Sequence, residues 1–192
     1  PDEGFVLTSI WCDKTEGTPY CQKDPENPDS VIVPTMVREP YSCYNEPGSD
    51  FSAGCQESIR YSEGPPGKYN TDEQYPNTYF NIARGLVATD VEESVVRIRL
   101  LNSFLAAIMI FFAISLDRKH HLDWFITLLA VVSPVSSFFI ASVNTSSWLL
   151  IGSIGFVTAF SNAIKNRRKI LILLPASATS IFAYWLANAS RH

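Results

Sequence analysis

Four apolar runs fill most of the second half of the chain, and each is long enough to cross a bilayer. They cover residues 95–116, 122–143, 148–164 and 170–187. An α-helix rises about 1.5 Å per residue, so runs of this length approximate the ~30 Å hydrocarbon thickness of a membrane. The sequence therefore predicts a mainly α, polytopic membrane protein with about four transmembrane helices and with membrane lipids as its immediate partners.

Charge sets these runs apart from an unlike first half. Residues 1–94 hold 17 of the 19 Asp and Glu residues but only six of the 15 Lys and Arg residues. Pro, Gly, Asp, Asn and Ser recur between residues 13 and 74, where they favour turns and prevent long helices. We therefore expect residues 1–94 to be an irregular loop region and residues 95–192 to be the transmembrane region.

All four cysteines lie in the loop region, at Cys12, Cys21, Cys43 and Cys55. An even set in a polar segment is typical of disulfides formed in an oxidising compartment. Short loop closure favours Cys12 with Cys21 and Cys43 with Cys55, although four cysteines allow three connectivities. A zinc site is the alternative, but the cysteines are not closely paired and all three histidines lie in the other half, so no metal site is predicted.

The connectors between the apolar runs predict the orientation of the chain. Loops 117–121 and 165–169 hold six Lys and Arg residues, whereas residues 144–147 hold none. Basic loops stay in the cytoplasm, which places residues 1–94 on the extracytoplasmic side of a cell membrane. The cysteines independently indicate the same side.

Two segments of the loop region are expected to be helical. Residues 1–12 predict a short helix that Asp2 caps. Residues 77–88 are apolar but too short to span a bilayer, so they predict a helix lying in the membrane interface, with a helix in a soluble core as the alternative. The chain begins at Pro1 with neither an initiator Met nor a signal peptide, so we expect a further helix upstream.

Polar residues near the expected outer surface are the candidates for chemistry. The carboxylates of Asp2 and Glu3 can act as a general base or as ligands for a divalent metal ion, or can simply cap a helix. Arg97 and Arg99 fall at the level of lipid phosphates, which an arginine fork binds bidentately. Ordinary lipid headgroups or an ion pair with a nearby glutamate would also explain these arginines.

Further candidates lie along the first span and in the outer turn. Asn102 shares a helix face with Arg99. Asn144 and Trp148 belong to a polar turn that either lines a site or is a tight turn with an aromatic anchor. The chain contains no phosphate loop, dinucleotide fingerprint, hydrolase elbow or nucleic-acid-binding patch, so soluble-enzyme chemistry and nucleic-acid partners are not expected.

Five stretches of the chain carry a resemblance to a known family. They are Pro1-Asp2-Glu3, Leu7-Thr8-Ser9-Ile10-Trp11-Cys12, Tyr75-Pro76, Arg97-Ile98-Arg99-Leu100-Leu101-Asn102 and Asn144-Thr145-Ser146-Ser147-Trp148-Leu149. Over essentially its whole length the chain resembles actinobacterial predicted membrane proteins grouped as domain of unknown function 2142. Thr145 stands where the likeness would lead us to expect a proline.

That family is in turn similar to the GT-C class of glycosyltransferases, which use polyprenyl-phosphate sugars. The resemblance implies a cell-envelope enzyme in which Asp2, with Glu3, is the base and Arg97 or Arg99 meets the leaving phosphate. Tyr75 begins the stretch that stands in place of a His-Pro-Pro or Lys-Pro-Pro element, without its basic residue. Two alternatives stay open: a transporter or flippase of an envelope lipid, and a non-catalytic membrane-anchored assembly or binding protein.

Overall fold

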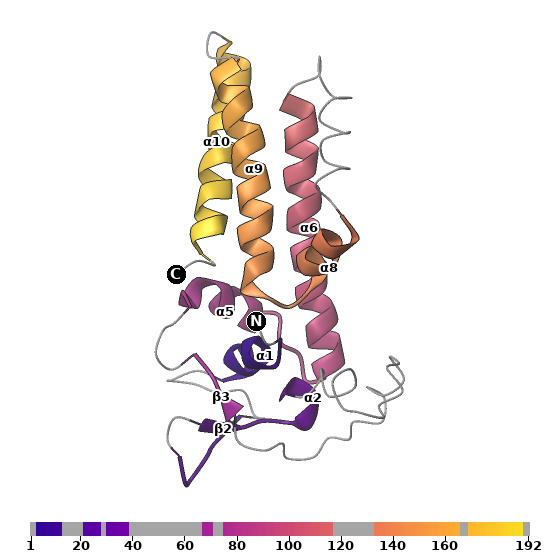
Figure 1. Cartoon of the computed structure of the whole chain (residues 1–192), viewed down its shortest axis with the longest axis vertical. Helices are drawn as coiled ribbons and strands as arrows, with labels where there is room; N and C mark the ends of the chain where they lie inside the picture. Colours follow the sequence, from indigo (N-terminus) through magenta and orange to yellow (C-terminus); the bar gives the residue numbers. More distant parts are fainter. Residues whose placement is uncertain are drawn as a thin grey trace. The chain divides into compact units, whose positions relative to one another are not determined.

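The computed structural model describes residues 3–12, 21–27, 30–38, 67–70, 75–116, 133–165 and 169–189 (Figure 1). These residues are mainly helical, which confirms the predicted fold class. The chain divides into two compact units, Pro1–Arg97 and Ile98–His192. Each unit is described by itself below.

The first unit is built around α1 (Glu3–Trp11), the predicted short helix. Leu7, Ile10 and Trp11 are among its buried side chains, each no more than 2% exposed. Because α1 is covered on nearly every side, its own polar groups need local partners. The Thr8 hydroxyl donates to the carbonyl of Gly4 at 2.7 Å, one helical turn back.

A small antiparallel sheet accompanies α1 and was not predicted from the sequence. Its order is β1 (Gln22–Lys23), β2 (Ser30–Ile32) and β3 (Gly67–Lys68), with Gln22 opposite Ile32 and Ser30 opposite Lys68. Strands of two or three residues are too short for alternating polarity to show in a sequence. The prediction of a wholly irregular region between residues 13 and 74 was therefore wrong in this respect.

Three valine side chains are buried in this part of the first unit. Val31 and Val33 lie in and after β2, and Val37 lies in the single-turn α2 (Thr35–Arg38) that follows. All three are at most 2% exposed. The α2 helix packs against α1, so the apolar residues of the loop region share one core with the first helix.

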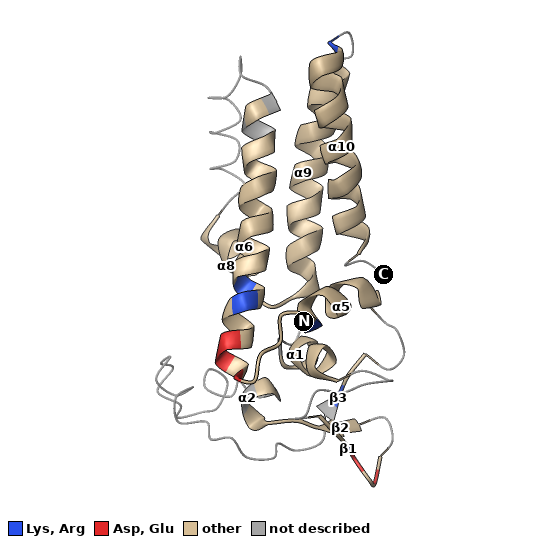
Figure 2. Cartoon of the chain, turned by 180° about the vertical axis from the view of Figure 1, so that it is seen from behind, with Lys and Arg blue, Asp and Glu red and all other residues tan. Residues whose placement is uncertain are grey.

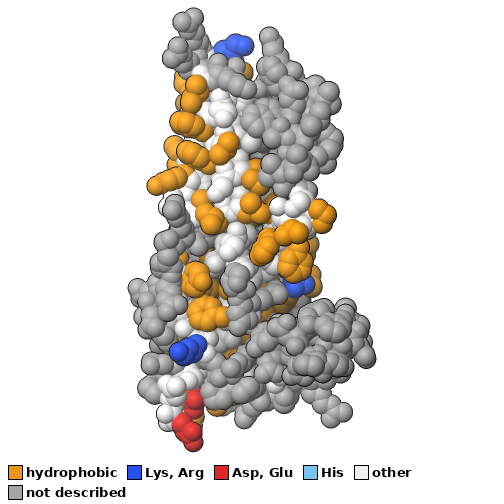
Figure 3. Space-filling view, in the orientation of Figure 1, with side chains coloured by type: hydrophobic (Ala, Val, Ile, Leu, Met, Phe, Trp, Pro, Cys, Tyr) orange, Lys and Arg blue, Asp and Glu red, His pale blue; other side chains and the backbone are white. Residues whose placement is uncertain are grey.

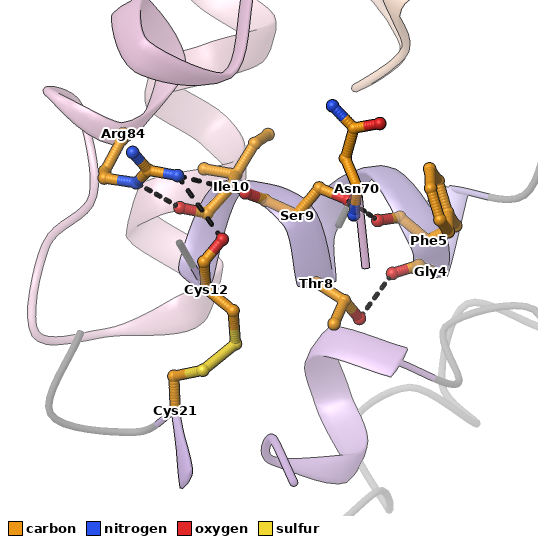
Figure 4. Close-up of a disulfide and its surroundings, with 9 residues drawn as sticks. All are labelled: Gly4, Phe5, Thr8, Ser9, Ile10, Cys12, Cys21, Asn70 and Arg84. Atoms are coloured by element: carbon orange, nitrogen blue, oxygen red, sulfur yellow. Dashed lines mark hydrogen bonds between the residues drawn. A yellow bond between two sulfur atoms is a disulfide. The ribbon is translucent and has the colours of Figure 1, made fainter. Parts of the chain in front are cut away.

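The structure confirms one of the two expected disulfides. Cys12 and Cys21 are bonded, with their Cα atoms 5.6 Å apart. The bond joins the residue that follows α1 to the residue that precedes β1 (Figure 4). Cys43 and Cys55 lie outside the described residues, so their pairing stays a prediction.

The expected helix after Tyr75 is present as α5 (Asn77–Arg84). Its apolar face, formed by Tyr79, Phe80 and Ala83, is at most 2% exposed, and α5 packs against α1 within the first unit. This burial matches the core-helix alternative. Whether α5 also lies in a membrane interface stays a prediction.

Three described helices are long and apolar enough to cross a membrane. They are α6 (Val91–Leu116), α9 (Thr145–Lys165) and α10 (Ile170–Asn188), which contain the candidate spans Val91–Phe112, Thr145–Ile164 and Ile170–Asn188. They correspond to the first, third and fourth predicted runs. Of the second run, 122–143, the structure describes only the end, which forms α8 (Pro134–Ala141).

The beginnings of α6 and α8 are explained by local capping. The Asp90 carboxylate accepts a hydrogen bond from the Glu92 amide at 3.1 Å, so α6 begins with a capped first turn. At α8, Ser133 accepts from the Ser136 amide at 3.2 Å, and Pro134 occupies the first helical position, where no backbone donor is needed.

Large apolar side chains face outward along all three spans. Leu171 is 87% exposed, and others are exposed by more than half: Leu100, Phe104, Phe111, Val157, Leu174 and Ile181. Figure 3 shows such side chains crowding one face over α9 and α10. Contiguous apolar surface of this kind is stable against lipid rather than water, so these faces contact lipid in this membrane protein.

Close approach of α9 and α10 depends on Gly152. A Cβ atom built at Gly152 would lie 2.6 Å from the Ala183 carbonyl oxygen and 2.7 Å from the Ala187 amide nitrogen. At Gly155 the nearest atom would be the Sδ of Met109 in α6, at 3.0 Å. Small residues let helix backbones approach closely, as membrane helices require when no hydrophobic effect drives them together.

We predict that Gly152→Ala destabilises the second unit by about 1–3 kcal/mol, because the added methyl group meets rigid backbone. Gly155→Ala is expected to cost less, because the Met109 thioether can move aside. Equilibrium unfolding in mixed detergent micelles measures both, with Ser153→Ala on the exposed face of α9 as the control. Alanine favours helices over glycine, so a Gly152→Ala protein as stable as the unaltered one would contradict this packing.

Candidate functional site

Of the two candidate acidic residues, which are consecutive in the sequence, one belongs to α1. Glu3 is the first residue of this helix, whereas Asp2 and the side chain of Glu3 lie outside what the structure describes. The first turn of a helix carries unpaired amides and partial positive charge, which stabilise a carboxylate placed there. The location suits either a cap or a base held on a fixed element.

The opposite end of α1 is fixed by an arginine from α5. Arg84 donates to three carbonyls in and just after the last turn of α1. Its Nε donates to Ile10 at 3.0 Å, and its Nη2 donates to Ser9 at 3.2 Å and to Cys12 at 3.4 Å (Figure 4). The last carbonyls of a helix have no partner within the helix and carry partial negative charge. Arg84 satisfies them with a cation, close to the disulfide at Cys12.

A second hydrogen-bonded contact joins Ser9, near the end of α1, to Asn70, which lies between β3 and α5. The Ser9 hydroxyl accepts from the Asn70 amide at 3.1 Å. The Asn70 side chain in turn accepts from the Tyr75 amide at 3.1 Å and donates to the Tyr75 carbonyl at 2.7 Å. The Tyr75 ring lies 6.0 Å from that of Phe5. Tyr75, predicted to contact substrate, thus contacts α1 directly through its ring and indirectly through Asn70.

Arg97 and Arg99 both lie near the beginning of α6. Arg97 forms an ion pair with Glu93, one turn earlier, at 2.6 Å, and both side chains are about half exposed. This is the intrahelical pairing weighed as an alternative from the sequence. Arg99 is exposed. Acidic and basic turns therefore follow each other at the beginning of α6 (Figure 2).

Asn102 and Trp148, both predicted to bind substrate, meet inside the second unit. The Trp148 Nε1 donates to the Asn102 Oδ1 at 2.9 Å, and the Asn102 Nδ2 donates to the Ser142 carbonyl at 2.8 Å. Asn102 is fully buried and Trp148 is 1% exposed. These three residues, here called the asparagine cluster, join α6 to the turn after α8 and to the beginning of α9.

Asn144, the third predicted contact of this region, stabilises the beginning of α9. Its side chain accepts from the Ser146 amide at 2.9 Å, and its carbonyl accepts from the Ser147 hydroxyl at 2.7 Å. Asn144 is 4% exposed and lies two residues after Ser142 of the asparagine cluster. Asn102, Asn144 and Trp148 are thus all buried and hydrogen-bonded, Asn102 to Trp148 and Asn144 within its own turn, which matches the tight-turn alternative.

The predicted site residues are divided between the two units. Glu3, Tyr75 and Arg97 belong to the first unit. The second unit contains Arg99, Asn102, Asn144 and Trp148. Sequence reasoning missed Arg84 and Asn70. The signal at Arg84 was a lone cation inside an apolar stretch, and Asn70 gave none. Within the described part of the chain, no group of three His, Cys, Asp or Glu residues is placed to hold a metal ion.

These features define a polytopic helical membrane protein with a disulfide-bonded N-terminal unit. The chain belongs to the family described as Predicted membrane protein (DUF2142), whose model matches residues 2–187. This match confirms the family that the sequence resembles, and the description assigns no activity to it. No curated protein and no solved structure matches the chain.

We predict that Arg84→Met destabilises the first unit by about 2 kcal/mol, because the buried end of α1 loses its charged donor. Arg84→Lys should fall in between, since lysine keeps the charge but cannot reach several carbonyls with a planar fork. Equilibrium unfolding of the intact protein measures both, with the exposed Lys68→Met as the control. An Arg84→Lys protein as stable as the unaltered one would contradict the role of the fork.

For the asparagine cluster, Asn102→Leu should cost about 1–3 kcal/mol, because it leaves the Trp148 indole N–H without its acceptor. Trp148→Phe should cost less in the Asn102→Leu background than alone, giving a coupling of about 1 kcal/mol in a double-mutant cycle. Additive losses of stability would show that the two side chains act independently.

Proposed function

We propose that the chain is part of a cell-envelope enzyme of the GT-C type, which moves a sugar from a polyprenyl-phosphate donor to an envelope glycan or lipid acceptor. In this proposal residues 1–94 lie on the extracytoplasmic side of the cell membrane, and loops 117–121 and 165–169 lie in the cytoplasm. Asp2, assisted by Glu3, is the general base. The observation that carries the proposal is that Glu3, which Asp2 precedes in the sequence, is the first residue of a firmly held helix.

The support from α1 is its rigidity. Its core residues are buried, and Arg84 donates hydrogen bonds to the carbonyls of its last turn. The disulfide bond between Cys12 and Cys21 fixes the residue that follows the helix. A catalytic carboxylate must stay within a fraction of an ångström of its working position, which elements locked by packing achieve better than free loops. The short helix α1 is such an element, because packing, an arginine and a disulfide bond each hold it.

Arg97 and Arg99 are suited to bind the phosphate of the donor. Both guanidinium groups lie near the beginning of a candidate span, and a guanidinium donates two parallel hydrogen bonds to a phosphate. The ion pair of Arg97 with Glu93 is surface exposed and worth at most about 1 kcal/mol, so an arriving phosphate can replace the glutamate.

The proposed step is an inverting displacement. The Asp2 carboxylate takes the proton of the acceptor hydroxyl as the oxygen lone pair forms a bond to the anomeric carbon. The bond from that carbon to the phosphate oxygen breaks, and the polyprenyl phosphate leaves with the electron pair. Arg97 or Arg99 stabilises the charge that develops on the leaving phosphate.

The interiors of α6, α9 and α10 favour an enzyme over an ion-coupled transporter. Residues 100–116, 145–164 and 170–189 contain no Asp, Glu, Lys, Arg or His. Coupled transporters place such residues within their spans as ion or proton sites. In α6 and α9 the charged residues lie instead toward one end of the helix.

The proposal predicts that Asp2→Asn abolishes sugar transfer while the protein remains folded. The measurement is transfer of radiolabelled sugar from polyprenyl-phosphate donors to envelope acceptors in membranes that contain the intact protein. Loss of a general base typically costs about 10²–10⁴-fold in rate. Glu3→Gln should lower the rate less than Asp2→Asn does, and Glu26→Gln, an exposed acid elsewhere in the first unit, is the matched control.

The outcomes separate the competing functions. Undiminished transfer by Asp2→Asn would remove Asp2 as the base. No transfer by the unaltered protein with any donor tested would count against an enzyme and for lipid transport or for an assembly role.

A further inference from the structure

The disulfide between Cys12 and Cys21 joins two segments that the first unit holds unequally. Cys12 is 1% exposed, whereas Cys21 is partly exposed. The Cys12 amide donates to the Thr8 carbonyl at 2.8 Å, and the Cys12 carbonyl accepts from Arg84 at 3.4 Å. In Figure 4 this carbonyl points toward Arg84, while the side chain points the other way, to Cys21. Cys12 is therefore held by bonds that do not involve its sulfur.

On the other side of the disulfide, Cys21 leads into β1, which is weakly held. Among the described strands β1 lies at the edge of the sheet, and it pairs with β2 through two residues. Both of its side chains, Gln22 and Lys23, are exposed, so β1 adds no apolar side chain to the core. A two-stranded pairing is marginally stable at best in water. A strand this short therefore depends on its covalent attachment through Cys21.

The position of α1 does not depend on the same covalent bond. Ile10 and Trp11 are fully buried, and the Arg84 Nε donates to the Ile10 carbonyl at 3.0 Å. The Asn70 amide donates to the Ser9 hydroxyl at 3.1 Å. These contacts remain when the two sulfurs separate. Opening the disulfide therefore frees β1 before it disturbs α1.

We propose that this disulfide is a thiol-exchange site, which a protein dithiol opens at Cys21 so that β1 is released while α1 stays in place. A thiolate must reach the sulfur that it attacks, and access decides which of two bonded sulfurs reacts. Cys21 is the more accessible of the two residues. This inference does not depend on the proposed glycosyl transfer.

The exchange proceeds in two displacements. A thiolate of the dithiol forms a bond to the Cys21 Sγ, and the Cys12 Sγ leaves with the electron pair of the broken disulfide and takes up a proton. The second thiolate of the dithiol then attacks the sulfur of its own molecule in the mixed disulfide, and Cys21 leaves as a thiol. The dithiol is thereby oxidised to a disulfide, and its two electrons reduce the bond between Cys12 and Cys21.

Trapping the mixed disulfide tests which sulfur is attacked. The intact protein in detergent micelles is treated briefly with reduced glutathione, free thiols are alkylated with N-ethylmaleimide, and the peptides are mapped by mass spectrometry. We expect glutathione on Cys21 several-fold more often than on Cys12, with N-ethylmaleimide on Cys12. Equal labelling of both, or glutathione mainly on Cys12, would overturn the proposal. So would a folded protein in which neither cysteine reacts although both react in guanidinium chloride.

Hydrogen exchange of the intact protein tests what the opened bond releases. Reduction with dithiothreitol should speed amide exchange several-fold in β1 and at Asp24, whose amide donates to the Ser30 carbonyl at 3.1 Å. Exchange in the last turn of α1 should stay unchanged. Unchanged exchange in β1, or equally faster exchange throughout α1, would overturn the proposal.

A protein that carries both Cys12→Ser and Cys21→Ser is the matched control for reduction. It should show the fast exchange in β1 without dithiothreitol, which separates the effect of this bond from any effect at Cys43 and Cys55. Slow exchange in β1 of this variant would show that the strand does not need the bond, and would overturn the proposal.

Discussion

A polar group that leaves water must find a hydrogen-bond partner, and much of the described structure follows from how this chain provides one. At the buried end of α1, Arg84 supplies donors for carbonyls that the helix itself leaves unpaired. In the second unit, Asn102 accepts from the Trp148 indole and donates to the Ser142 carbonyl. Each arrangement joins elements that are distant in sequence, so satisfying these groups also determines the packing of each unit.

The same constraint acts within the spanning helices on a shorter scale. Thr158, Thr179 and Ser180 each donate a hydroxyl proton to a carbonyl one turn earlier in their own helix. Hydroxyls that are hydrogen-bonded in this way present no unpaired donor to lipid or to a neighbouring helix. Contact between α9 and α10 is then a matter of shape, which explains why the surface at Gly152 must be so small.

Features set by local sequence were predictable. The lengths of α6, α9 and α10 follow from unbroken apolar runs, and the bond between Cys12 and Cys21 follows from the short loop it closes. Features that depend on distant partners were not. Nothing near Arg84 shows that its partners lie more than 70 residues earlier. Asn102 and Trp148 looked like exposed contacts because only the folded chain shows that they bury each other.

The proposed function requires the acidic, disulfide-bonded unit and the basic connectors to lie on opposite sides of the cell membrane. The most direct measurement introduces a single additional cysteine at Glu26 or at Lys169, both exposed, and applies a membrane-impermeant maleimide to intact cells. The unaltered chain gives the background from the native cysteines. The account predicts labelling of Glu26→Cys in intact cells and of Lys169→Cys only after permeabilisation. Labelling of both positions from the same side would contradict it.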